Sequence, residues 1–308
     1  MEYDESIQRA LAELRQATGL TLEVSADCSE QKSAIAEQLR LLTSAYREKY
    51  NKIHFLQSLL TGESPSCNVQ ERAARFHISA EEPRILYLVE TEQKFEDMLR
   101  EVLKGLFPSQ SGAYLIPVSA NLTAVLCSRT SIVRHGETGE TALTFARTIV
   151  DTLSAEAFTR VRVSYGRTTD SLTELSSSFQ EANLALKVGK LFFSGQTVFP
   201  YNRLGVGRLI YRLPFDLCEN FLHEIFGDDI PTQLDEETAA TAAQFFQNNL
   251  NIAETSRQLH IHRNTLIYRL EQIQHRTGLD LRSFEDAATF KIATMVINYL
   301  HAERRMRP

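Results

Sequence analysis

One stretch near the end of the chain carries side chains suited to reading a nucleic acid. Residues 250–278 read LNIAETSRQLHIHRNTLIYRLEQIQHRTG, which predicts two short amphipathic helices joined by a tight turn. Hydrogen-bond donors and acceptors gather at the start of the second helix. A helix that enters the major groove of DNA reads base edges from its N-terminal residues. We therefore expect seven side chains to face DNA: His262, Arg263, Asn264, Thr265, Tyr268, Arg269 and Gln272.

These side chains differ in what they can recognise. Arg263 and Asn264 suit base edges, because each can form paired hydrogen bonds with a purine. Thr265, Tyr268 and Arg269 suit phosphate oxygens, which position a protein on DNA without reading its sequence. The alternative is an ordinary helical hairpin with a solvated polar face, since this pattern alone also occurs in proteins that do not bind DNA.

Apolar and capping residues must hold the two helices in place. Asn251 can cap the first helix, and Glu254 lies three residues further on, close to a capping box. His260 occupies the turn, where many such motifs have glycine, and histidine is among the residues that tolerate a positive φ. A spacing of four and three predicts one buried stripe on the second helix, formed by Leu266, Leu270 and Ile273.

Residues 245–300 resemble the C-terminal helix-turn-helix of the PucR/CdaR family of bacterial transcriptional regulators. The matching motifs are N-x-x-E-T-x-R-x-L from Asn251, I-H-R-N-T-L-x-Y-R-L from Ile261 and T-G-L-D from Thr277. The resemblance implies sequence-specific binding of double-stranded DNA. It also implies control by a small metabolite, although no residue identifies that molecule or its site. Proteins of this kind commonly read two half-sites with two subunits, so we expect a palindromic operator.

Strands and helices alternate in the middle of the chain, which predicts a mixed α/β sheet covered by helices. The expected strands cover residues 84–90, 113–118, 122–127 and 160–166, and a long helix is expected to end at Gly189. This part resembles the degenerate GGDEF-like domain of the same regulators. The resemblance is carried by V-S-Y-G from Val163 and L-x-E-L-x-x-S-F-x-E-A-x-x-A-L-x-V-G-K from Leu172.

The hairpin of that domain lacks the residues that a nucleotide cyclase would need. Such an enzyme uses glycines to approach the nucleotide and carboxylates to hold the catalytic metal. Here the hairpin runs from Pro117 to Asn121 as PVSAN, with neither glycine nor acid. We therefore expect no catalytic residues and no enzymatic activity.

A long helix is predicted for residues 29–60. Its apolar residues are spaced four and three apart, at Ile35, Leu39, Leu42, Tyr46, Ile53, Leu56 and Leu60. A heptad pattern of this length favours pairing of two helices, so we expect a homodimer through the N-terminal helix. The alternative is that the stripe packs on the next domain of the same chain.

Composition excludes several classes of protein. The 308 residues carry a net charge of −6, which argues against a non-specific binder of polyanions, whereas residues 245–282 contain five arginines against three acidic residues. We expect no signal peptide, no membrane span and a cytoplasmic location. The cysteines are too far apart in sequence to indicate a zinc site or a disulfide framework: Cys28, Cys67, Cys127 and Cys218.

We expect neither a metal nor a cofactor. His223, Glu224, Asp228 and Asp229 have metal-binding side chains, but their loose spacing fits the end of a helix stopped by Gly227. The glycines of LGVGRL (residues 204–209) lack the strand–loop–helix context of a nucleotide-binding loop.

The sequence therefore predicts a multidomain α+β protein. We expect an N-terminal helical dimerisation segment (1–62), a degenerate GGDEF-like α/β domain (63–203), a linker helix (204–237) and an all-α helix-turn-helix domain (238–308). The expected function is transcriptional regulation by sequence-specific DNA binding. The alternative is a ligand-sensing signalling protein whose helix-turn-helix serves as a protein-docking module.

Overall fold

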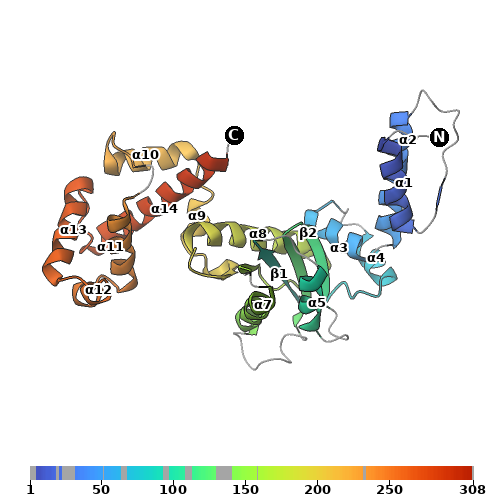
Figure 1. Ribbon diagram of the computed structural model, residues 1–308, viewed down its shortest axis with the longest axis horizontal. Helices are drawn as coiled ribbons and strands as arrows, with labels where there is room; N and C mark the ends of the chain where they lie inside the picture. The colour runs from blue at the N-terminus through green and yellow to red at the C-terminus, as the bar shows by residue number, and fades with distance from the viewer. Residues whose placement is uncertain are drawn as a thin grey trace. The chain divides into compact units, whose positions relative to one another are not determined.

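The computed structural model describes residues 5–18, 21–22, 32–50, 52–63, 68–92, 97–107, 113–129, 141–157, 159–231 and 234–306. Its contacts divide the chain into two compact units, Met1–Asn183 and Leu184–Pro308. The multidomain α+β class is as expected, with a sheet in the middle of the chain and helices at its end (Figure 1). Among the helices described, none is long and apolar enough to cross a bilayer.

Five strands form one sheet with the order β2-β3-β1-β4-β5. They are β1 (Arg84–Thr91), β2 (Tyr114–Ser119), β3 (Leu122–Ser128), β4 (Val161–Tyr165) and β5 (Val198–Pro200). β1 pairs antiparallel with both β3 and β4, and β2 pairs antiparallel with β3. The central position of β1 follows from its sequence, RILYLVET, because a strand covered on both faces reads as a nearly continuous apolar run.

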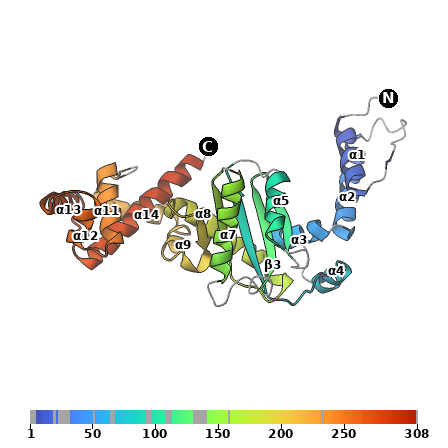
Figure 2. The ribbon, with the colours of Figure 1, turned by 60° about the horizontal axis from the view of Figure 1, so that its bottom comes forward.

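Helices cover both faces of this sheet. Successive side chains of β1 point to opposite faces. Leu86 and Leu88 share a core with α3 (Lys52–Thr61), α4 (Val69–Arg75) and the first half of α8 (Leu175–Phe192). On the other face, the ring of Tyr87 lies 5.6 Å from that of Phe145. Phe145 belongs to α7 (Thr141–Ala157), which packs beside α5 (Asp97–Gly105), as Figure 2 shows.

The N-terminal stripe of apolar residues is shared between two helices. α2 (Lys32–Tyr50) packs along α1 (Glu5–Thr18), which buries Ile7, Ala10 and Leu14. The apolar residues of α3 instead lie in the core of the sheet domain, where Leu56 and Leu60 are buried. For this half of the stripe, packing on the chain's own next domain is the interpretation that holds.

The first half of the stripe is less covered. Ala36 and Thr43 are the buried positions recorded for α2, whereas Leu41 and Leu42 expose 63% and 53% of their surface. These two leucines leave an apolar surface on α2 that the described part of the chain does not cover.

The expected helix end at Gly189 was wrong, because α8 continues to Phe192. A Cβ atom built on Gly189 would lie 2.2 Å from Cγ of Phe199. Phe199 is buried in β5. The glycine is thus required for close packing rather than for a helix cap.

Unit Leu184–Pro308 contains the remaining helices. They are α9 (Gly207–Ile210), α10 (Phe215–Phe226), α11 (Glu236–Gln247), α12 (Ile252–Gln258), α13 (Arg263–Thr277) and α14 (Phe284–Met306). Two apolar cores lie along α14: Phe290 packs with α11 and α13, whereas Ile297 and Leu300 pack with α10. Figure 1 shows α14 running from the α11–α13 group to α10.

Two of the cysteines are buried free thiols, Cys127 and Cys218. Cys28 and Cys67 lie outside the described residues. Nowhere in the described ranges do three or more His, Cys, Asp or Glu side chains gather in a way that could hold a metal ion. The ring of His223 instead contacts the carbonyl oxygen of Gly227 at 2.8 Å and the carboxylate of Asp228 at 3.4 Å.

Candidate nucleic-acid interface

The helix-turn-helix predicted from the sequence is formed by α12 and α13. Its core unites these helices with α11 and α14, and the predicted stripe of Leu266, Leu270 and Ile273 is buried. The stripe packs against Ala242 and Phe245 of α11 and Phe290 of α14. The core covers one side of α13, so the opposite side of the helix is exposed and can face a ligand.

Asn251 caps α12 as expected, accepting a hydrogen bond from the backbone N–H of Glu254 at 3.1 Å. The carboxylate of Glu254 does not reach back to complete a capping box. It accepts hydrogen bonds from Arg257 at 2.6 Å and from Gln258 at 2.8 Å. The cap therefore depends on Asn251, and Glu254 stabilises the outer surface of the helix.

The turn between the two helices is held by His260, whose φ is +55°. Its backbone N–H bonds to the carbonyl of Arg257 at 3.2 Å, and the N–H of Ile261 bonds to the carbonyl of Ser256 at 3.0 Å. The positive φ expected at this position is thus present, and these two bonds satisfy carbonyls at the end of α12.

α13 is capped at both ends. The Nδ1 atom of His262 accepts a hydrogen bond from the backbone N–H of Asn264 at 3.3 Å. Gly278 ends the helix with φ +73° and donates its N–H to the carbonyl of Gln274 at 2.7 Å. His262 therefore has a structural partner in addition to being exposed.

Six of the seven side chains expected at a DNA interface are exposed, four of them at the N-terminal end of α13 and two further along the helix. They are His262, Arg263, Asn264, Thr265, Tyr268 and Gln272. Tyr268 contributes an aromatic ring to this set, and 60% of the residue's surface is exposed. Residues 262–270 include no acidic side chain, and Glu271 is the first one along α13.

Sequence reasoning missed two members of this surface. Asn264, Tyr268, Glu271 and His275 are spaced four, three and four apart, and all are exposed. The same spacing that predicted the buried stripe thus also defines an exposed row on the opposite side of the helix. Glu271 and His275 extend that row towards the end of α13.

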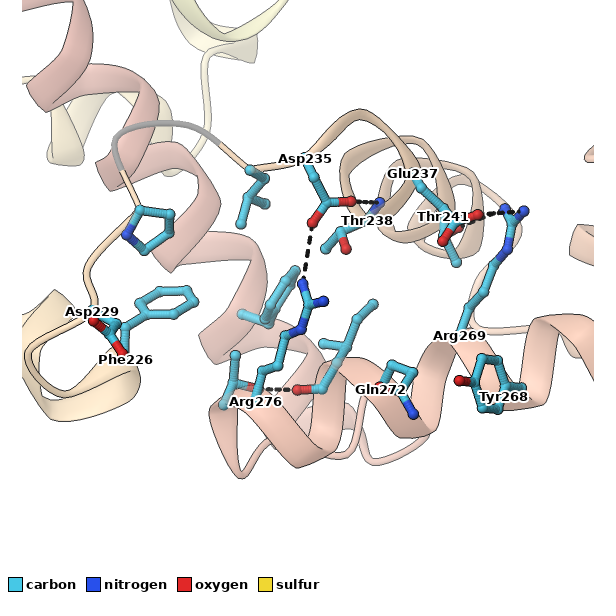
Figure 3. Close-up of a pocket in the computed structure, with 15 residues that line it drawn as sticks. Phe226, Asp229, Asp235, Glu237, Thr238, Thr241, Tyr268, Arg269, Gln272 and Arg276 are labelled. Atoms are coloured by element: carbon cyan, nitrogen blue, oxygen red, sulfur yellow. Dashed lines mark hydrogen bonds and ion pairs between the residues drawn. The ribbon is translucent and has the colours of Figure 1, made fainter.

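The seventh residue, Arg269, lies elsewhere. Its side chain is only 24% exposed, and Nη2 lies 2.8 Å from Oε1 of Glu237 on α11. Nη1 donates to the hydroxyl of Thr241 at 3.3 Å. Figure 3 shows Arg269 pointing from α13 to this pair. The arginine is therefore engaged within the protein.

Two acidic residues expected to belong to a linker, Asp235 and Glu237, form ion pairs with arginines of α13. Asp235 caps α11 by accepting the N–H of Thr238 at 2.8 Å. This hydrogen bond lowers the pKa of the Asp235 carboxyl, and the Thr238 side chain and then the positive charge of Arg276 add to the effect. Arg276 itself lies 3.4 Å from Asp235. No local sequence signal indicates these pairs, because their members are separated by more than thirty residues.

The β2–β3 hairpin of the sheet domain has its turn at Ala120 and Asn121. The N–H of Thr91 donates to the carbonyl of Asn121 at 3.0 Å, and the Asn121 side chain donates to the carbonyl of Thr91 at 3.3 Å. The turn is thereby tied to the end of β1 by side chain and backbone. It offers neither a glycine nor a carboxylate to a nucleotide or metal.

Comparison with known families matches both parts of the chain. Residues 238–296 match the PucR C-terminal helix-turn-helix domain, and residues 61–188 match the GGDEF-like domain. The two matched segments are the domains that characterise the PucR/CdaR family of transcriptional regulators. The second match establishes only a likeness of fold to GGDEF domains.

Similar proteins carry regulator names. The carbohydrate diacid regulator of Escherichia coli is 25% identical over 266 residues, which are 83% of this chain and 68% of that protein. The purine catabolism regulatory protein of Bacillus subtilis is 28% identical over 123 residues, which are 40% of this chain and 23% of that protein. A crystal structure described as a regulator of polyketide synthase expression from Bifidobacterium adolescentis covers 84% of this chain and 94% of its own, with 14% identity and a TM-score of 0.37. That score is too low to support a structural argument.

Proposed function

We propose that this regulator binds double-stranded DNA by inserting the start of α13 into the major groove. The observation that carries the proposal is the exposed polar surface at the start of α13, which the core formed with α11 and α14 leaves uncovered. Arg263 and Asn264 would read base edges, and Thr265 and Tyr268 would contact phosphate. His262 and Gln272 would flank them.

We further propose that the protein acts as a homodimer through its N-terminal helices. Leu41 and Leu42 on α2 supply exposed apolar surface, and two subunits would match a palindromic operator. Light scattering coupled to size-exclusion chromatography tests this point with Leu42→Asp. A dimeric parent and a monomeric variant are expected. An unchanged mass would place the contact elsewhere.

The sheet domain is proposed to serve regulation rather than catalysis, with a small metabolite as the effector. The turn locked between Asn121 and Thr91 supports this reading, because it presents no group that could hold a catalytic metal. Incubation with magnesium and a nucleoside triphosphate should give no cyclic product above that of buffer. If the parent forms a cyclic product and a variant of the sheet domain does not, the domain is catalytic and the proposal is wrong.

One experiment tests the main proposal. Duplexes selected from a random pool by the full chain should converge on one motif, and a dimer should select a palindrome. Affinity for the selected duplex should fall steeply as salt rises, since each phosphate contact adds about 0.9 to the log–log slope. Failure to enrich any sequence would contradict the proposal.

A protein-docking role is the second candidate, and the exposed ring of Tyr268 is the observation that favours it. Aromatic side chains are enriched in protein interfaces. In that case duplex DNA should bind weakly and without sequence preference. A flat salt response would favour docking over operator binding.

A further inference from the structure

The contact between α13 and the start of α11 is made beside a hollow. A cavity of about 710 Å³ opens beside this contact, and its lining includes Thr238 and Thr241 of α11 and Tyr268, Arg269 and Gln272 of α13. Figure 3 shows polar side chains at the α13 side of this space. Apolar packing joins the two helices through Ala242 and Phe245 of α11, whereas polar side chains make the contact at the start of α11.

Two ion pairs lie beside this hollow, and they differ in strength. The pair between Arg276 and Asp235 spans 3.4 Å, and both side chains are more than half exposed, so solvent screens it. The pair between Arg269 and Glu237 spans 2.8 Å, and the arginine side chain is only 24% exposed although the glutamate is 63% exposed. The second pair is therefore the stronger restraint.

Thr241 adds direction to the second pair. Its hydroxyl oxygen accepts a hydrogen bond from Nη1 of Arg269, and the residue is fully buried. The guanidinium thus contacts α11 through two nitrogens, one on Glu237 and one on Thr241. Such a two-point contact restricts orientation as well as distance.

The place of Arg269 on α13 agrees with an inward role. At about 100° per residue, Arg269 lies roughly 60° from Leu266 and 40° from Ile273, both of which are buried. The same geometry places it about 140° from Asn264, which belongs to the exposed row. Its side chain therefore leaves the helix on the flank that faces α11.

We propose that Arg269 is a positioning residue that sets the DNA specificity of α13 without touching DNA. Through Glu237 and Thr241 it fixes the rotation of α13 about its own axis. The apolar stripe alone restrains this rotation less, because hydrophobic contacts are non-directional. Base readout depends on that rotation, since paired hydrogen bonds to a base edge need aligned donors. The inference rests on the DNA-binding function proposed above.

The test compares four variants of the full chain with the parent. Arg269→Gln and Glu237→Gln each remove one partner, and the double variant Glu237→Arg/Arg269→Glu restores the pair in reverse. Arg304→Gln is the control, because it removes another exposed Arg–Glu pair of the same unit, 2.6 Å from Glu219 on α10. Affinity for the selected duplex and for random duplex is measured at several salt concentrations.

Both single variants should lower the ratio of the two affinities about tenfold, and the reversed pair should restore most of it. The salt slope should stay unchanged in Arg269→Gln, since no phosphate contact is lost. A slope that falls by about 0.9 with an unchanged ratio would show that Arg269 binds phosphate, and would overturn the proposal. Higher affinity of Glu237→Gln for both duplexes would also overturn it, because a released Arg269 would then have reached DNA.

Amide hydrogen exchange of the DNA-free protein separates this inference from the proposed function. Amides in α13 should exchange faster in both single variants than in Arg304→Gln, and the reversed pair should restore protection. If the parent does not discriminate between duplexes, the DNA-binding proposal fails. The exchange data still decide whether the pair positions α13, and unchanged exchange in Arg269→Gln would refute that role.

Discussion

Gly189 lies against the ring of Phe199 so closely that a Cβ atom at this position would be 2.2 Å from Cγ of the ring. Both residues belong to the unit that begins at Leu184, and Phe199 is buried. Any side chain larger than hydrogen would have to displace the aromatic ring. The close approach of α8 and this phenylalanine therefore depends on a glycine in the interior of a helix.

Gly189→Ala should lower the free energy of unfolding by about 2–3 kcal/mol, the cost typical of an overpacked core. Urea denaturation followed by circular dichroism measures the change. Gly195→Ala is the matched control, because no atom lies within 4 Å of its added Cβ. Equal stability of the two variants would contradict the contact between Gly189 and Phe199.

Stability at acidic pH should depend on Asp235. The N–H of Thr238 lowers the pKa of this carboxyl in the folded protein, so its stabilising effect is fully present above the unfolded value of about 3.9. The effect is lost as pH falls below that value through the folded pKa. Asp235→Asn should remove this dependence while keeping the cap, because asparagine caps helices about as well.

Urea midpoints of the parent and of Asp235→Asn at pH 7, 5, 4 and 3 measure this effect. On acidification the parent should lose stability that the variant keeps, and the difference should be small because the Asp235 side chain is 53% exposed and solvent screens its charge. Asp280 also has a lowered pKa, caused first by its hydrogen bond from Arg282, so only the difference between the two proteins is informative. Parallel pH profiles would exclude a role for the Asp235 carboxylate.

The turn at His260 allows a test of backbone conformation alone. His260→Gly and His260→Ala remove the same imidazole, but only glycine adopts φ +55° without strain. The glycine variant should be about 1 kcal/mol more stable than the alanine variant. Thermal unfolding of the two proteins in the same buffer gives the comparison, and the opposite order would contradict the left-handed turn.

Arg263→Ala should lower affinity for the selected duplex by about 1–3 kcal/mol and leave the fold intact. Arg263 is exposed at the first position of α13, so its removal uncovers no core. Titration of labelled duplexes measures the loss, with Arg304→Ala as a control outside the helix-turn-helix. Unchanged affinity for the selected duplex would remove Arg263 from the reading surface.

Local sequence patterns predicted the helices of the helix-turn-helix domain well. The four-and-three spacing on α13 identified Leu266, Leu270 and Ile273 as core residues, and Asn251 was correctly placed as a cap. Strand β1 was also recognisable, because its apolar run has few other interpretations. These features depend on residues close together in sequence, where periodicity and capping chemistry are informative.

Features that depend on distant residues were not predictable in the same way. Gly189 was expected to end a helix, because a glycine in the sequence does not distinguish a helix cap from close packing against a ring, here that of Phe199 ten residues further on. Arg269 was placed on the DNA-facing surface, since nothing near it in sequence indicates Glu237 or Thr241 on another helix. The salt slope of DNA binding in Arg269→Gln tests whether its guanidinium contacts phosphate.

The two apolar cores along α14 have a practical consequence for dissecting the protein. A fragment beginning at residue 238, where the family match begins, would retain Phe290 among its partners but would lose α10. Ile297 and Leu300 would then face water, and the fragment would tend to aggregate through that strip. A fragment of the helix-turn-helix domain for crystallisation or spectroscopy should therefore start upstream of Phe215, so that α14 keeps its contacts with α10 as well as with α11 and α13.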